Sequence, residues 1–218
     1  MSKGTSSCIP SLMPDIPPPE TDKYAGERLS IMQIFTTLLS YDHGILRQVL
    51  DVMSDIAEND TWEQNRDALP DAADFLQRFM DQYHHGKEER FLFPAAPASE
   101  KRLKEQVDEL VTEHRQAKAY ADAIGKGLED WDLDILRDNV NGVVAHMRKH
   151  ILEEENNVFP EFNRVLDPEK DMPMYEESQK FMEERFGASF QADMEEFANR
   201  LQDRVMGKGV IKYGPMGP

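Results

Sequence analysis

The chain has 218 residues and a formal net charge of −17 at pH 7, because 42 acidic residues outnumber 25 lysines and arginines. This length suits one core of ordinary size, or one domain with an appendage. A chain this acidic repels phosphate backbones and anionic lipid head groups unless its cations are clustered, and the sequence holds no such cluster. We therefore expect neither a nucleic-acid partner nor a membrane partner.

The N-terminus and the cysteine content narrow the class of protein further. No apolar run approaches the roughly 20 residues that cross a bilayer, and no charged-then-apolar secretory signal is present. A soluble, cytoplasmic protein is expected. The single cysteine, Cys8, has no partner for a disulfide or a thiolate metal site, which leaves histidine and carboxylate to carry the chemistry.

The composition divides the chain into four parts. Residues 1–23 are rich in Ser and Pro and predict a disordered arm, and residues 207–218 predict a flexible Gly/Pro tail. Residues 24–166 show apolar spacing typical of helices, and no Asn-Gly or Asp-Gly turn joins two alternating runs. Residues 167–206, rich in Met and Phe on an acidic background, predict a C-terminal helical extension. The predicted fold class is all-α.

Four long helices are predicted ahead of this extension, each with an apolar stripe. Proline, N-cap Ser or Asp, and C-cap glycine mark their limits. Because the connections are short, we expect an antiparallel up-down four-helix bundle with extra C-terminal helices. The predicted spans are residues 27–57, 70–93, 100–125 and 133–158, with Ser99 and either Asp132 or Asp134 as N-caps and Gly125–Gly127 as a C-cap.

One face of the extension is apolar and must be covered. We expect it to pack on the outside of the bundle; a lid over one end of the bundle and a homodimer surface are the alternatives. The residues recur every three or four positions, as one side of a helix requires: Phe190, Met194, Phe197, Leu201 and Val205.

A repeated motif ends the second and fourth predicted helices. The two copies align without a gap, and each has His nine residues and Glu five residues before the Phe of a Phe-Pro pair. Residues four apart face the same way on a helix, so His84 with Glu88, and His150 with Glu154, can each reach one metal ion.

The second helix offers two overlapping pairs, and periodicity decides between them. Helical steps back from His84 meet apolar residues, whereas steps back from His85 meet charged ones. We therefore predict that His84 and Glu88 face the core, while His85 and Glu89 point to water. On this interpretation, replacing His85 by Ala should leave the metal content unchanged.

The first and third helices each place one histidine, His43 and His114, on an apolar face. One buried histidine is usually a hydrogen-bonded core residue, but here all four helices present one. Burying these imidazoles and two carboxylates without a cation would cost several kcal/mol. The predicted metal ligands are His43, His84, Glu88, His114, His150 and Glu154.

The identity of the metal follows from the donor types. Mixed imidazole and carboxylate ligands suit iron better than calcium or magnesium, and the absence of thiolate argues against structural zinc. Bridging carboxylates would let the set hold two ions with open positions for O2, NO or peroxide. His146 lies one turn before His150 on the same face, and its role stays open between an extra ligand, a hydrogen-bond donor to a ligand, and a gate.

These residues resemble the hemerythrin-like, HHE cation-binding domain family, over about residues 30–166. The resemblance implies a four-helix bundle around two iron ions, an Fe-O-Fe centre bridged by the two glutamates. It points to the bacterial branch, whose members are tied to oxygen or redox sensing, peroxide removal, NO handling and repair of iron centres. The matching motifs are Asp42-His43, His84-x-x-x-Glu88, Glu113-His114 and His150-x-x-x-Glu154.

The chain departs from the oxygen carriers of that family at two places. The carriers have a second histidine four residues after the first on the third helix, where this chain has Lys118. They also have an aspartate five residues after the histidine of the fourth helix, where this chain has Glu154 at four. The lost histidine would open a position on one iron, unless His146 restores the count.

Two functions are compatible with this pattern. The first is reversible binding of O2, NO or peroxide for sensing, storage or detoxification, which requires a dry, apolar pocket. The second is a di-iron oxidoreductase with peroxidase-like, catalase-like or NO-reducing activity, which needs an electron-transfer partner and a nearby proton donor. A bundle whose histidines bind nothing is the third alternative. The candidate proton donors are Tyr41, Tyr83, Glu113, Lys118 and His146.

Overall fold

A computed structural model of the chain describes residues 33–209. The predicted arm at residues 1–23, the first residues of the predicted first helix, and residues 210–218 of the predicted tail lie outside the described residues. Every regular element between residues 33 and 209 is a helix, so the predicted all-α class is confirmed. None of the helices in this range has both the length and the apolar character that crossing a membrane requires.

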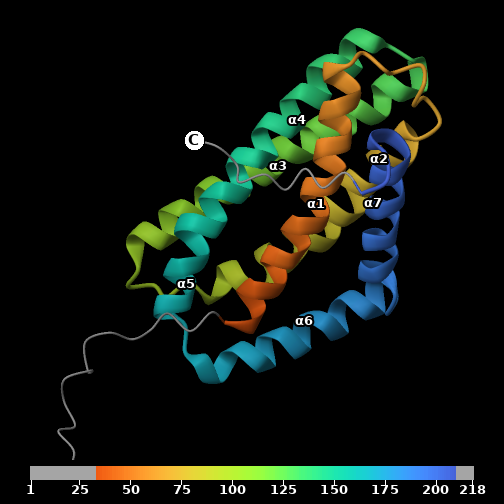
Figure 1. Ribbon diagram of the computed structural model, residues 1–218. Coiled ribbons are helices and arrows are strands. Elements are labelled where there is room, and N and C mark those ends of the chain that lie inside the picture. Colours follow the sequence, from red (N-terminus) through yellow and green to blue (C-terminus); the bar gives the residue numbers. More distant parts are fainter. Residues whose placement is uncertain (1–32, 210–218) are drawn as a thin grey trace, which may run out of the picture.

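Four helical segments lie side by side, and successive segments turn back along one another (Figure 1). The first is α1 (Ile34–Glu58) and the third is α3 (Lys101–Asp130). The other two change their winding along their length. The second comprises α2 (Leu69–Phe75), the π-helical η1 (Leu76–His85) and η2 (Glu88–Leu92), and the 3-10 turn η3 (Phe93–Ala95); the fourth comprises α4 (Leu133–Glu153), the π-helical η4 (Glu154–Val158) and α5 (Phe159–Val165).

The helix caps only partly follow the sequence prediction. Asp132 caps α4, because its carboxylate accepts hydrogen bonds from the backbone N–H groups of Asp134 and Ile135. The other two predicted caps are wrong. Glu100, not Ser99, is the N-cap residue of α3, and it makes no side-chain cap bond. The helix also continues through the predicted C-cap glycines to residue 130, and Gly127 lies close to Ile135 and Leu136 of α4, where its small size serves packing.

Gly142 shows this use of a small residue most clearly. A Cβ atom at Gly142 of α4 would lie 2.4 Å from Cε1 of Tyr120 on α3, which is closer than any carbon–carbon contact tolerates. We expect Gly142→Ala to destabilise the fold by about 1–3 kcal/mol, the usual cost of overpacking. Thermal unfolding would measure this.

Gly44→Ala is the matched control for this change. Gly44 also lies inside a long helix, α1, but apart from its chain neighbours and the nearby backbone of its own helix no atom lies within 4 Å of an added Cβ. The exchange should therefore be neutral or stabilise by up to about 1 kcal/mol, because alanine favours a helix interior over glycine. Equal unfolding midpoints for the two variants would contradict the packing argument.

The C-terminal extension wraps around the bundle. After the turn η5 (Pro168–Lys170), α6 (Asp171–Phe186) crosses one end of the bundle and α7 (Phe190–Met206) runs along its side (Figure 1). Asp171 ties the extension to the start of α1, where its carboxylate accepts hydrogen bonds from the backbone N–H groups of Ile34 and Phe35, at 2.6 and 3.1 Å.

The apolar face of α7 packs on the bundle, which is the arrangement we favoured among the three alternatives. Phe190 and Leu201 are buried in the core, and the other three residues of the face are partly buried against it. Phe197 stacks on Phe75 of α2, with ring centroids 5.8 Å apart. The homodimer remains a prediction.

Candidate metal centre

The six predicted ligands converge in the middle of the bundle, together with a seventh side chain, His85. Their ligand atoms form two groups, and within each group these atoms lie within 4.8 Å of one another. All seven side chains belong to residues that are at most 2% exposed. The first group is His43, His84, Glu88 and Glu154, and the second is His85, Glu88, His114 and His150.

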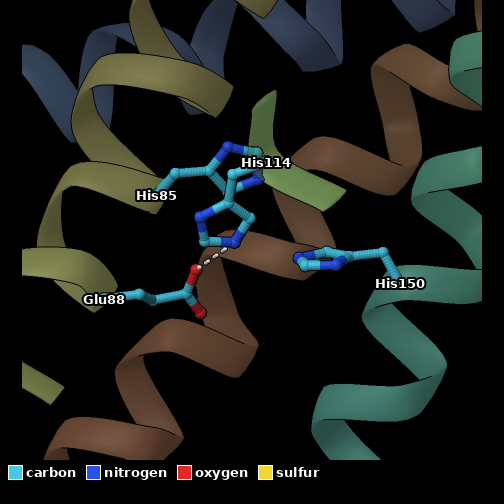
Figure 2. A group of neighbouring side chains, drawn as sticks. All are labelled: His85, Glu88, His114 and His150. Carbon is cyan, nitrogen blue, oxygen red and sulfur yellow. Dashed lines mark ion pairs between the residues drawn. The ribbon is translucent and has the colours of Figure 1, made fainter. Parts of the chain in front are cut away.

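Glu88 is shared by the two groups. Its Oε1 lies 3.6 Å from Nε2 of His84 in the first group. Its Oε2 lies 3.4 Å from Nε2 of His114 in the second group, a contact drawn in Figure 2. The carboxylate therefore offers one oxygen to each group, as a ligand that bridges two metal ions would.

Glu154 repeats this arrangement from the fourth helical segment. Its Oε2 lies 3.1 Å from Nε2 of His43, and its Oε1 lies 3.3 Å from Nε2 of His150. Both carboxylates begin π-helical stretches, η2 and η4, so the repeat in the sequence becomes a repeat in local geometry. Two carboxylates thus span the space between the two groups of imidazoles.

Carboxylates orient four of the five imidazoles from behind. In each of these histidines Nδ1 faces a carboxylate oxygen, which favours the proton on Nδ1 and leaves the lone pair of Nε2 pointing inward. Such an arrangement is typical of histidines that bind a metal. The Nδ1–oxygen distances are 3.0 Å for His43 and Glu155, 3.4 Å for His84 and Asp42, 2.8 Å for His114 and Glu89, and 2.9 Å for His150 and Glu113.

The inward atoms have no hydrogen-bond partners among the described residues. This holds for Nε2 of all four oriented imidazoles, for both nitrogens of His85, and for both oxygens of Glu88 and of Glu154. Each buried polar atom left without a partner costs about 1–3 kcal/mol, and more if charged. A pair of cations would satisfy these atoms apart from one nitrogen of His85, because an imidazole offers one nitrogen to an ion, and a nitrogen and oxygen donor set without thiolate fits iron.

The two carboxylates oppose each other's ionisation. Burial and the nearby charge of Glu154 raise the pKa of Glu88 well above its ordinary value. Burial acts the same way on Glu154, but the charges of His150 and His43, whose Nε2 atoms lie next to its oxygens, outweigh it and hold the pKa of Glu154 well below its ordinary value. A cation bound between the carboxylates would remove this conflict, because it stabilises both in the ionised form.

Residues 35–162 match the family model described as the hemerythrin HHE cation-binding domain. The chain belongs to this family. Uncharacterized proteins of Mycobacterium bovis and Mycobacterium tuberculosis are each 24% identical to it over 194 residues, which is 84% of this chain and 76% of theirs. No solved structure matches the chain. The HHE match contains all seven converging side chains, whereas α6 and α7 lie beyond it.

The prediction that His85 points to water is wrong. His85 is 1% exposed, and its ring stacks on that of His114 with centroids 3.7 Å apart (Figure 2). The cause is the winding of the second segment, which is π-helical at residues 76–85 and 88–92. A π-helix pairs residue i with i+5 and turns less per residue than an α-helix, so two successive histidines can share the inward face.

His85 supplies a fifth imidazole to this HHE centre. Relative to the oxygen carriers that the sequence motifs resemble, one histidine is missing, and His146 is the candidate from the sequence to replace it. The structure places His85 in the second group instead. Burial lowers the pKa of His85 well below its ordinary value, and the neighbouring imidazoles add to the effect. The neutral imidazole is the form that binds a metal.

His146 lies outside both groups of converging side chains. It is partly buried, and its Nε2 lies 2.8 Å from the backbone carbonyl oxygen of Glu113. The Glu113 carboxylate in turn accepts a hydrogen bond from His150, which lowers the pKa of Glu113 to about 2. His146 thus contacts the backbone of Glu113 and not the carboxylate that orients His150.

A buried ion pair beside the centre was not predicted from the sequence. Asp42 is fully buried, and Nζ of Lys87, itself 4% exposed, pairs with its Oδ2, the oxygen that faces His84. Burial alone would raise the pKa of Asp42, but Lys87 and His84 hold it at about 2. Lys87 directly precedes Glu88. Both residues are buried, Lys87 between the two π-helical stretches and Glu88 at the start of the second.

Proposed function

We propose that the chain is a non-haem di-iron protein that binds O2, or the related small molecules NO and peroxide, for sensing, storage or detoxification. The observation that carries the proposal is the set of five buried imidazoles and two shared carboxylates whose inward atoms have no partners among the described residues. Membership of the HHE family supports a bound metal cation at this place. The donor types favour iron.

The five imidazoles are divided unequally between the two sides. The first group has two, His43 and His84, and the second has three, His85, His114 and His150. With both carboxylates shared, an ion in the first group would have fewer protein ligands. We therefore assign small-molecule binding to the side of His43 and His84. A ferrous pair with an open position there would supply the affinity for O2 or NO.

Apolar rings around the imidazoles favour reversible binding over turnover. Phe159 stacks on His43, and Phe93 stacks on His114, each with ring centroids 5.6 Å apart. These are the phenylalanines of the two Phe-Pro pairs, and both are at most 5% exposed. Burial of this kind keeps water and its protons away from a bound small molecule.

The alternative function is a di-iron oxidoreductase, and Lys87 is the observation in its favour. The five proton donors expected from the sequence lie outside both groups of converging side chains. Tyr41 and the Lys118 side chain are about half exposed. Lys87 is instead a buried ammonium group that pairs with Asp42, which contacts His84. An ammonium group at this place would supply the nearby proton donor that turnover of peroxide or NO requires.

Stopped-flow absorbance separates these functions. Iron-loaded, reduced protein mixed with O2 is expected to develop a new absorption band that disappears when argon removes the gas, because the buried site protects the bound molecule. The same protein without iron is the control. Rapid, irreversible oxidation with turnover of peroxide or NO would instead identify the oxidoreductase. A protein that retains less than half an equivalent of iron after loading would contradict both functions.

A further inference from the structure

The four carboxylates that orient imidazoles are not held in the same way. Glu155, Glu89 and Glu113 lie on helical segments within the HHE match, and their distances to Nδ1 are 2.8–3.0 Å. Asp42 is farther from its imidazole, His84, at 3.4 Å. It is also the one among the four that accepts a hydrogen bond from a described residue beyond the HHE match.

That residue is Gln191, in the first turn of α7. Its Nε2 donates to Oδ1 of Asp42 at 2.6 Å, across 149 positions of the chain. The other oxygen of Asp42 faces Lys87 and His84. Asp42 is therefore held on one side by the bundle and on the other by the C-terminal extension. Its orientation toward His84 depends on both.

A second contact of α7 reaches the same place. Phe190, next to Gln191, packs on Tyr83 with ring centroids 5.2 Å apart. The ring of Tyr83 in turn lies 4.2 Å from Nζ of Lys87, a cation–π contact. A cavity of about 50 Å³ borders this arrangement, and both Lys87 and Gln191 line it. The start of α7 thus contacts Asp42 directly and reaches Lys87 through the ring of Tyr83.

We infer that Gln191 is a positioning residue for the metal centre, which acts through Asp42 on His84 and so controls the iron on the side of His43 and His84. This inference rests on the proposed di-iron centre and assigns the C-terminal extension a role in it. Without the amide donor, Asp42 would turn further toward Lys87 and orient His84 less well. The second group, whose imidazoles have other partners, should be unaffected.

Gln191→Met tests this inference, because methionine keeps the length of the side chain and removes the donor. The matched control is Gln179→Met, which makes the same exchange at a residue that lines the same cavity. We expect Gln191→Met to release one of its two ferrous ions to a chelator about tenfold faster than wild type. Removal of a residue that orients a metal ligand usually weakens metal binding by about this factor or more. Gln179→Met should stay within about twofold.

Mössbauer spectroscopy of protein loaded with ⁵⁷Fe adds a readout that a general loosening of the fold would not give. One of the two iron signals should shift in Gln191→Met and the other should stay. Gln191→Glu, which replaces the donor by an acceptor of the same size, should have at least the same effect. Equal release rates for the variants at positions 191 and 179, or equal changes at both irons, would overturn the inference alone. An iron-free wild-type protein would overturn the proposed function with it.

Discussion

His85→Ala is expected to weaken binding of one of the two irons by about 100-fold or more. Loss of a residue that hydrogen-bonds to a metal ligand already lowers metal affinity by about 10- to 100-fold. His85 itself lies among the ligand atoms of the second group, so its loss should cost at least as much. This expectation reverses the one drawn from the sequence, because the structure buries the His85 ring against His114. Iron per chain, measured after desalting, is the readout.

His146→Ala is the matched control for this experiment. His146 is the sole histidine of the chain outside the two groups, and it contacts a backbone carbonyl rather than a carboxylate of the centre. It should keep two irons per chain. If the two alanine variants retain the same iron, either His85 is not a ligand or His146 is one, and the assignment of the fifth imidazole fails.

Glu88→Gln is expected to empty both iron positions at once. Glu88 contacts an imidazole of each group through a different oxygen, so the neutral amide removes a charged ligand from both ions. If Glu88 bound a single ion, its replacement would remove one iron per chain. Iron content and the Mössbauer signals of the remaining ⁵⁷Fe distinguish the two cases, and retention of one unaltered iron signal would show that Glu88 does not bridge.

Glu88→Gln should stabilise the fold of the metal-free protein, although it weakens iron binding. Burial and Glu154 raise the pKa of Glu88 in the fold, so at neutral pH folding must protonate this carboxyl or bury its charge. Glutamine avoids this cost and should raise the unfolding midpoint at pH 7. The gain should vanish as the pH falls toward the ordinary pKa of glutamate, below which the carboxyl is protonated in both states. Glu153→Gln, one residue before Glu154 in the partner helix, should show neither effect.

The repeat and the helical periodicity predicted much of the centre. His84 with Glu88 and His150 with Glu154 were paired from their spacing, and His43 and His114 from their apolar faces; the structure brings all six together. This works because four-residue spacing on a helix is a local property, and burial of the apolar face decides which side turns inward. The Asp132 cap followed from local chemistry in the same way.

The helical periodicity of the sequence did not predict how the second helical segment winds. An α-helical turn throughout was the expectation, and it fails in η1 and η2; His85 ends η1, Lys87 lies between the two π-helical stretches, and both residues are buried. A π-helical turn is rare and tends to occur at functional sites, where packing around a ligand outweighs the preference for the α-helix. Two features of the sequence could have indicated this winding: the adjacent residues His84 and His85, and the lack of a fifth histidine among the predicted ligands.

The amino-acid sequence by itself determined the helices, most of their inward faces and six of the seven converging side chains, because these depend on neighbours within a few turns. Only the tertiary structure decided how the second segment winds, which histidine completes the set, and that Gln191 reaches Asp42 across 149 positions. Such contacts depend on how separate helices pack against one another. No spacing within a single helix records them.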